Sequence, residues 1–341
     1  MRDTPATYTT APLPRELQVE VTGSCNLRCK MCLASYRPAL GRREGSLSLD
    51  TFRALLDANP QLERVTVQGL GEPLLAPELF EMVELAAGRK VDVGFNTNGM
   101  LLTPARSERL ICAGLAWLHV SLDGARAETY EAIRGRGDFR RVVQNIKGLV
   151  AAKRRLGADR PRLQLNFVAM RRNVEELPEL VRLVSDWGLE RLWVQNLSHS
   201  FDDTDPSGSY AGIRSFAAVE ALWSADDRRL IEAVFDAARA EATRLGVPLR
   251  LPQLEEHERP ARAAGEPGCS WPWTSAYVTH DGKVQPCCMV MGSDRATLGD
   301  LGERSFVEIW GGERYRAFRQ RLMSDQPPSV CQGCSAYRGV F

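Results

Sequence analysis

The sequence has 341 residues, 44% of them hydrophobic and 26% charged, which is enough for one large domain with a smaller one beside it. Its 44 Lys and Arg nearly balance its 43 Asp and Glu, so no overall charge favours nucleic acid or an anionic membrane. The start lacks the features of a signal peptide, and no apolar run is long enough to span a membrane. We therefore expect a cytoplasmic protein without nucleic-acid or membrane partners.

Short apolar strands alternate with amphipathic helices through the first two hundred residues, a pattern typical of βαβ units and a parallel sheet. The expected strands are Leu17–Thr22, Val65–Gln68, Val91–Asn96, Trp117–Leu122, Leu163–Ala169 and Arg191–Gln195. The expected helices are Leu49–Ala58, Pro77–Ala87, Pro104–Ala113, Phe139–Leu156 and Val174–Trp187. Six units are too few for a closed eight-unit barrel, so we expect an α/β fold with a partial (β/α)6 TIM-type barrel and a site at the carboxyl ends of its strands.

The chain after the sixth strand contains fewer regular patterns. Ser198–Ser215 is rich in Ser, Asp, Gly and Pro and predicts a loop, which either covers the barrel mouth or lies on the surface. A long helix is expected at Ala225–Leu245, followed by a short strand near Leu249. The polar segment Glu255–Pro267 marks the expected boundary between a core of residues 1–254 and a second domain of residues 255–341.

The second domain begins with a hairpin signal. Ala276–Thr279 and Lys283–Gln285 flank the turn sequence Asp281-Gly282. A helix is expected at Ser305–Met323.

Seven of the nine cysteines fall in three compact groups, which indicates metal ligation rather than disulfides. The first group, Cys25, Cys29 and Cys32, directly follows the first strand. Three close thiolates can bind three irons of a cubane cluster and leave the fourth iron open for another ligand. The alternatives are a zinc knuckle or incidental buried cysteines, but zinc would need a fourth ligand and no His or Cys follows within a plausible distance.

Together with Gly69-Leu70-Gly71-Glu72-Pro73 after the second strand, this cysteine pattern resembles the radical S-adenosylmethionine (SAM) superfamily over roughly Leu17–Leu197. The resemblance implies a [4Fe-4S] cluster that binds and cleaves SAM, giving a 5′-deoxyadenosyl radical that abstracts a carbon-bound hydrogen. In the family the glycine-glutamate-proline motif receives the amino group of SAM. Glycines let the backbone approach the ligand, and Glu72 offers a charged acceptor for the ammonium group.

Asn96-Thr97-Asn98-Gly99 and Ser121-Leu122-Asp123-Gly124 also resemble family patterns, although a glycine turn after a strand is often only a turn. By this resemblance the expected SAM-binding residues are Gly69, Gly71, Glu72, Pro73, Asn96, Ser121, Asp123, Asn166 and Gln195. No residue can be chosen as a catalytic acid or base. His119 and Cys112 are expected in the interior.

A later set of cysteines can ligate a second metal centre. Four thiolates fill every iron of a cubane, and a closed cluster suits electron transfer. The expected ligands are Cys269, Cys287, Cys331 and Cys334. A structural zinc site with four cysteines is the alternative.

With the nearby Trp271-Pro272-Trp273 and Ile309-Trp310, this set resembles the C-terminal SPASM extension of radical SAM enzymes, or its shorter twitch form. Because the chain ends soon after Cys334, the resemblance implies one auxiliary [4Fe-4S] cluster, as in the 2-deoxy-scyllo-inosamine dehydrogenase type. Cys288 is an alternative ligand, a hydrogen donor or a buried thiol, and the last is favoured.

Two functions fit this resemblance. In the first, the enzyme abstracts hydrogen from a small polar metabolite (a sugar, aminocyclitol or nucleoside) in natural-product biosynthesis, with oxidation or another radical rearrangement as the outcome. In the second, it matures a ribosomally synthesised peptide by thioether or carbon–carbon crosslinking or by epimerisation. Peptide maturases often carry an N-terminal leader-binding domain, whereas only 16 residues precede the first expected strand, which favours the metabolite. Either reaction needs an external electron donor of the flavodoxin or ferredoxin type.

Overall fold

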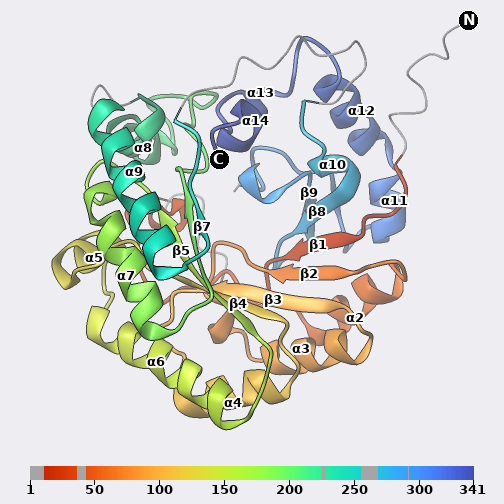
Figure 1. Cartoon of the computed structure of the whole chain (residues 1–341). Helices are drawn as coiled ribbons and strands as arrows, with labels where there is room; N and C mark the ends of the chain where they lie inside the picture. The colour runs from red at the N-terminus through yellow and green to blue at the C-terminus, as the bar shows by residue number, and fades with distance from the viewer. Residues whose placement is uncertain (1–10, 37–43, 225–227, 255–267, 291) are drawn as a thin grey trace, which may run out of the picture.

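One ten-stranded sheet organises the chain, with the strand order β10-β9-β8-β1-β2-β3-β4-β5-β6-β7. The computed structural model describes residues 11–36, 44–224, 228–254, 268–290 and 292–341. The strands are β1 Glu16–Val19, β2 Arg64–Val67, β3 Asp92–Thr97, β4 Trp117–Ser121, β5 Arg162–Val168, β6 Arg191–Gln195, β7 Leu249–Arg250, β8 Ser275–Val278, β9 Lys283–Gln285 and β10 Gly299–Asp300. Strands β1 to β7 are parallel and curve into an open arc (Figure 1).

Helices lie on the outer face of this arc, as Figure 1 shows for α2 to α7 and α9. The helices are α2 Leu49–Asp57, α3 Leu79–Gly88, α4 Pro104–Cys112, α5 Ala127–Arg134, α6 Phe139–Arg155, α7 Leu177–Trp187, α8 Ala211–Glu220, α9 Arg228–Leu245, α10 Trp271–Thr274, α11 Phe306–Trp310, α12 Glu313–Leu322, α13 Ser329–Gln332 and α14 Ser335–Arg338. The expected partial barrel is confirmed, with β7 as a short seventh strand.

Side-chain caps set the starts of several core helices. Ser48 accepts a hydrogen bond from the Thr51 amide at the start of α2, and Asp138 does the same for the Arg141 amide of α6. Thr103 caps α4, in which a proline occupies the first turn. These starts agree with the sequence prediction because a cap is a local signal.

The helices differ from the sequence prediction in three places. Helix α5 was not expected, and α8 occupies the region from Ala211 in which a loop was predicted. Helix α8 forms because Ile213 and Ala217 bury one apolar face. The helix expected over Ser305–Met323 is two helices, α11 and α12, because two successive glycines separate them.

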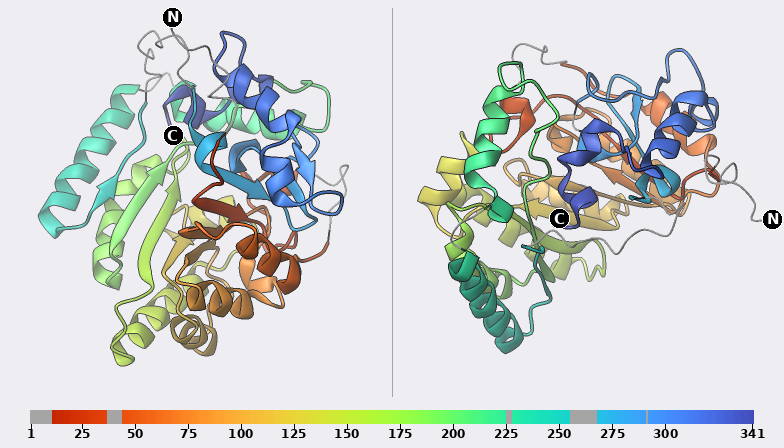
Figure 2. Two further views of the ribbon diagram at one scale, coloured as in Figure 1. Left: turned by 90° about the vertical axis from the view of Figure 1, so that its right-hand side faces the viewer. Right: turned by 90° about the horizontal axis from the view of Figure 1, so that it is seen from above.

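The C-terminal segment extends the same sheet instead of forming a detached unit. Strand β8 pairs in parallel with β1, with Glu16 opposite Ser275, and β9 returns antiparallel to β8 as predicted. Both views of Figure 2 show the blue C-terminal segment beside the red start of the chain. The boundary expected at 255–267 lies outside the described residues, so the division into two domains stays a prediction.

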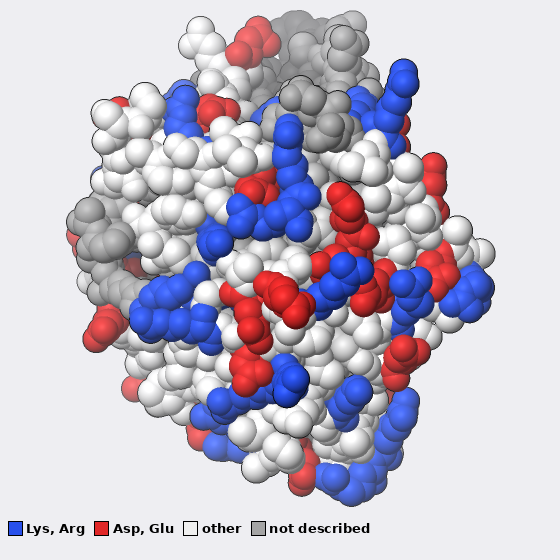
Figure 3. Space-filling model, turned by 90° about the vertical axis from the view of Figure 1, so that its left-hand side faces the viewer, with Lys and Arg blue, Asp and Glu red and all other residues white. Residues whose placement is uncertain are grey.

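Charged residues of both signs are interspersed over the face that carries helices such as α7 and α9 (Figure 3). Arg182 of α7 and Glu241 of α9 form one ion pair on this face, 3.3 Å apart. Within the described ranges, no helix is long and apolar enough to cross a bilayer.

Trp310 joins the C-terminal helices to the start of the chain. Its ring is 1% exposed and lies 4.9 Å from the Tyr315 ring, with the Arg319 guanidinium 4.3 Å from its centroid. Its Nε1 donates a hydrogen bond to the Pro12 carbonyl at 2.9 Å. The interaction therefore fixes the segment that leads into β1.

We expect Trp310→Ala to lower the free energy of unfolding by about 3–5 kcal/mol, because it leaves a large cavity and an unpaired carbonyl. Val307→Ala, in the same helix but exposed, should change it by less than about 0.5 kcal/mol. Urea denaturation of both variants and the wild type measures the difference. Equal losses in the two variants would contradict the anchoring role.

Candidate active site

The first cysteine loop follows β1 and is held by the end of helix α5. The amides of Arg28 and Lys30 donate to the carbonyls of Arg134 and Ile133 at 3.3 and 2.9 Å. Gly135 ends the helix with a positive φ of 44°, and a Cβ there would lie 2.7 Å from the Arg28 carbonyl oxygen. Helix α5, which sequence analysis missed, therefore shapes the loop that carries Cys25, Cys29 and Cys32.

Arg134 of α5 places a positive charge beside this loop. Its Nη1 lies 3.7 Å from the Cys29 sulfur, and its Nη2 pairs with Asp123 at 2.5 Å. Asp123 is fully buried and also accepts a hydrogen bond from the Val168 amide at 2.8 Å. Asp123, predicted as a SAM-binding residue, thus contacts Arg134 and β5 instead of the cavity.

The three thiols lie close enough to affect one another. Burial, together with the neighbouring Cys29 and Cys25, raises the pKa of Cys32 to about 12. Burial also raises the pKa of Cys29, while Arg134 opposes this effect. In the described ranges no three ligating side chains converge on a single metal ion. Three neighbouring thiols beside one cation fit a cubane cluster, in which each thiolate binds a different iron.

The glycines of the 69–73 motif are required by close backbone contacts. A Cβ at Gly71 would lie 2.0 Å from the Thr22 carbonyl oxygen, and one at Gly69 would lie 2.1 Å from the Glu20 carboxylate. The Glu72 amide donates to the Ser24 carbonyl at 2.8 Å. The motif therefore packs directly against the start of the cysteine loop.

The Glu72 side chain is directed into the protein. It is 2% exposed and accepts hydrogen bonds from the Thr97 hydroxyl at 2.7 Å, the Asn98 amide at 2.8 Å and the Leu74 amide at 3.2 Å. Burial raises its pKa, and these donors oppose the rise. In this geometry Glu72 positions the turn after β3, and its predicted contact with the SAM ammonium stays a prediction.

Glu20 is a central residue that sequence analysis missed. Its Oε2 accepts hydrogen bonds from the Leu70 amide at 2.7 Å and the Tyr277 hydroxyl at 2.8 Å, and its Oε1 lies 2.5 Å from His280 Nδ1. Burial alone would raise its pKa, but the hydrogen bonds from His280 and Leu70 lower it below the ordinary value. Glu20 therefore links the 69–73 motif to the C-terminal segment through a carboxylate.

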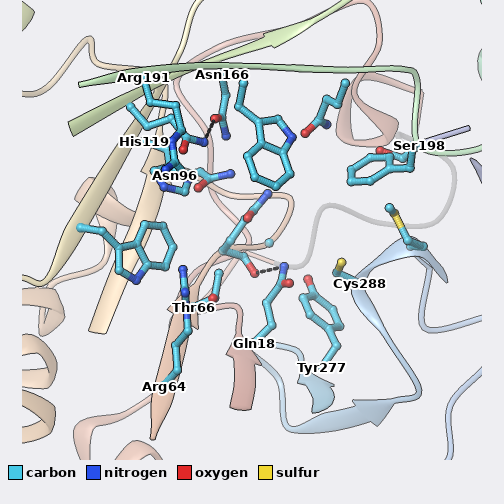
Figure 4. A pocket seen from close by; sticks show the side chains of 18 of the residues that line it. Gln18, Arg64, Thr66, Asn96, His119, Asn166, Arg191, Ser198, Tyr277 and Cys288 are labelled. Atoms are coloured by element: carbon cyan, nitrogen blue, oxygen red, sulfur yellow. Dashed lines mark hydrogen bonds between the residues drawn. The ribbon is translucent and has the colours of Figure 1, made fainter. Parts of the chain in front are cut away.

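A cavity of about 630 Å³ lies inside the arc of strands and extends to the C-terminal segment (Figure 4). Its lining includes four of the predicted SAM-binding residues, namely Gly69, Asn96, Asn166 and Gln195. The other five do not line it: Gly71, Glu72, Pro73, Ser121 and Asp123. Asn96 Oδ1 is buried and has no hydrogen-bond partner within the described chain, which leaves it free to accept one from a ligand.

The second cysteine set also gathers in one place. Burial raises the pKa of Cys287 well above its ordinary value, and Cys288, Cys334, Cys269 and Cys331 raise it further. Four other thiols are thus close enough to Cys287 to affect its charge, one more than a closed cubane needs besides Cys287.

Cys288 and Cys112 differ in their surroundings. Cys288 lines the cavity at the side of Tyr277, and burial raises its pKa to about 12 (Figure 4). Cys288 is therefore partly buried but also faces the cavity, where a ligand could reach its thiol. Cys112 is exposed at the end of α4, so its predicted place in the interior was wrong.

The segment after β6 connects the barrel to the second cysteine set. His199 forms a bridge with Cys334, and its Nε2 donates to the Val330 carbonyl at 2.7 Å. The Ser200 amide donates to the Gly333 carbonyl at 2.9 Å. This stretch was predicted as a loop, and the structure uses its first residues as a buried connection.

Residues 19–191 match the sequence profile of the Radical SAM superfamily. This match covers 173 of the 341 residues. The chain belongs to the radical SAM superfamily. Residues 269–335, which include all four predicted auxiliary ligands, match SPASM, an iron-sulfur cluster-binding domain. The two matches support a [4Fe-4S] cluster and SAM as cofactors.

Curated relatives have different activities. The tungsten-containing aldehyde ferredoxin oxidoreductase cofactor-modifying protein of Pyrococcus furiosus is 26% identical over 335 residues, covering 94% of this chain and 86% of that protein. The mycofactocin maturase MftC of Mycobacterium tuberculosis is 37% identical over 174 residues, covering 50% of this chain and 41% of the maturase.

The structure of Streptococcus suis SuiB bound to S-adenosylmethionine has a similar fold. It matches with a TM-score of 0.71 and 17% identity, over 98% of this chain and 73% of SuiB. At this identity the similarity concerns the fold alone. It agrees with a radical SAM partial barrel followed by a SPASM domain.

The number of clusters in this radical SAM protein can be measured by iron and sulfide analysis. Two cubanes predict about eight irons per chain after reconstitution, and the Cys269→Ala/Cys287→Ala variant should retain about four. Cys112→Ala, a change at an exposed cysteine, should retain all of them. About four irons with one zinc would contradict the auxiliary cluster, and about twelve irons would contradict a single one.

His119 gives a prediction for the pH dependence of stability. Its pKa is lowered to about 3, mainly by burial, so the unfolded chain binds a proton below pH 6.5 that the folded protein does not. The contribution of His119 to the free energy of unfolding is therefore fully present above pH 6.5 and is lost as the pH falls towards 3. Between pH 7.5 and 5.5 we expect a loss of about 1.4 kcal/mol that is absent in His119→Gln. Urea denaturation at both pH values tests this, and identical losses would contradict it.

Proposed function

We propose that this radical SAM enzyme removes a hydrogen atom from a small polar molecule bound in the cavity, with oxidation or another radical rearrangement as the outcome. The cavity is the observation that carries the proposal. It runs between Gly69 of the 69–73 motif and Cys288 beside the second cysteine set, and polar side chains from β1 to β6 and from β8 line it. A substrate held there lies between the two expected metal centres.

The chain's own residues have defined roles in this proposal. Cys25, Cys29 and Cys32 bind three irons of the cluster, and Arg134 donates a hydrogen bond towards the Cys29 sulfur. Gly69 lines the cavity where SAM would bind, Gly71 lets the motif pack against Thr22, and the unpartnered Asn96 Oδ1 accepts a hydrogen bond from SAM. When bound, the cluster and SAM supply a 5′-deoxyadenosyl radical that takes one hydrogen atom from the substrate.

Other predicted residues have supporting roles. Ser121 lies opposite Asn166 in the register of β4 and β5, next to the cavity wall, and Gln195 ends the neighbouring strand. We assign Asn166 and Gln195 to contacts with SAM or substrate. Asp123 acts indirectly, because it fixes the Arg134 guanidinium.

We assign the second cysteine set to one closed auxiliary cluster, as in the 2-deoxy-scyllo-inosamine dehydrogenase type. Four thiolates from Cys269, Cys287, Cys331 and Cys334 leave no open iron, so this cluster exchanges electrons without binding substrate. It would accept the second electron of the substrate when the product is oxidised, the first having left with the abstracted hydrogen atom. The electron that cleaves SAM would come from an external donor of the flavodoxin or ferredoxin type.

Peptide maturation is the second candidate function. The observation that favours it is the match to the maturase MftC, which at 37% is more identical than the match to the cofactor-modifying protein at 26%. The MftC match covers only half of this chain. We favour the small molecule because polar side chains on the strands line the cavity, and such groups fix the orientation of a polar ligand.

SAM cleavage tests the core of the proposal. Reduced, reconstituted wild-type protein should form 5′-deoxyadenosine, and Cys29→Ala should lower its formation at least about a hundredfold because the cluster loses a ligand. Cys112→Ala is the matched control, since it removes an exposed thiol on α4 and should leave formation unchanged. Chromatography of the products measures it. Undiminished formation in Cys29→Ala would refute the assignment.

A further inference from the structure

Three arginines line one end of the cavity, at the edge of the sheet opposite the cysteine loop. Each is the first residue of its strand: Arg64 of β2, Arg162 of β5 and Arg191 of β6. Trp117, the first residue of β4, lies opposite Arg162 in the register and lines the same end. Figure 4 shows Arg64, His119 and Arg191 together, on the side of the cavity away from Cys288. We call this part the basic end.

The pKa of His119 indicates that the charges of the three arginines act on the same side chain. Its pKa is lowered first by burial and then by the charges of Arg64, Arg191 and Arg162. The three guanidinium groups therefore lie near the same imidazole, although they come from different strands. Because the ring is neutral at pH 7, it can donate a hydrogen bond to an anion through its N–H.

The three arginines have no acidic partner among the residues that the structure describes, whereas neighbouring cations do. Arg160 pairs with Asp92 at 2.6 Å, and Lys153 pairs with Glu190 at 2.6 Å. Glu190 is the acidic residue of the cavity lining in the described chain, and its carboxylate is also bonded to the Leu163 amide. The basic end therefore carries an excess of positive charge.

Trp117 adds an independent observation. Its ring lies against Gly94, where a Cβ would come within 2.2 Å, and the Arg64 guanidinium lies 4.7 Å from its centroid. The ring is 3% exposed, and its Nε1 has no hydrogen-bond partner in the described ranges. A buried N–H without an acceptor is costly, and a bound oxyanion removes that cost.

We propose that the basic end binds an acidic group of the substrate, a carboxylate or a phosphate. This inference rests on the proposed function, because it places the reacting carbon near Gly69 and the acidic group at Arg64. These residues are five positions apart on one strand and its extension, roughly 16 Å. The substrate is therefore an elongated acid and not a compact neutral sugar.

Anion binding can be measured by isothermal titration calorimetry of the cluster-loaded protein with citrate and with pyrophosphate. We expect at least one probe to bind, and Arg64→Gln and Arg191→Gln to weaken its binding about tenfold each, because a charged donor becomes neutral. Arg191 is exposed, so its loss should leave the fold intact. Tighter citrate binding would assign a carboxylate, and tighter pyrophosphate binding a phosphate.

Arg53→Gln is the matched control, because Arg53 is exposed on α2 and does not line the cavity. It should bind the probe as the wild type does. Failure of both probes to bind, or equal affinity in all variants, would overturn the inference. Formation of 5′-deoxyadenosine in the same preparation tests the proposed function separately. A protein that cleaves SAM but binds neither probe contradicts only the proposed anion binding at the basic end. A protein that binds an anion but does not cleave SAM contradicts only the proposed function.

Discussion

The pairing of β1 with strands from both parts of the chain brings three functional loops to one edge of the sheet. β1 lies between β2 and β8 and is parallel to both. Parallel neighbours end at the same edge of a sheet, so the loops after β1, β2 and β8 meet there. The cysteine loop, the 69–73 motif and the turn with His280 are these loops, and Glu20 joins the last two through its carboxylate.

This arrangement divides the cavity into two chemically different ends. Gly69, Asn96 and Gln195 lie towards the carboxyl edge and suit SAM, whereas the amino edge carries guanidinium groups, and the imidazole of His119 between them is neutral at pH 7. In closed (β/α)8 barrels the amino edge usually serves stability, because side chains fill the barrel interior. Here the arc is open and the cavity reaches both edges, so residues at the amino edge can contact a ligand that extends from the reaction centre.

Local signals predicted most of the barrel. Alternating apolar residues predicted strands and helices to within a few residues, and Ser48, Thr103 and Asp138 cap the starts of three of these helices. The cysteine groups were predictable because their spacing is itself the chemical signal. Helix α5 and Glu20 were not, since their roles depend on distant contacts: Arg134 meets Cys29 across 105 positions, and Glu20 meets His280 across 260. The basic end was also missed, because each arginine at a strand start is unremarkable alone.

The parallel contact between β1 and β8 has a consequence for biosynthesis. Glu16 and Ser275, paired in the register, are 259 positions apart, so one edge of β1 stays without hydrogen-bond partners while most of the nascent chain leaves the ribosome. A free strand edge is a template for pairing with other chains. Timely completion of the C-terminal segment therefore protects the strand that precedes Cys25, and a truncated product exposes that edge next to the first cysteine loop.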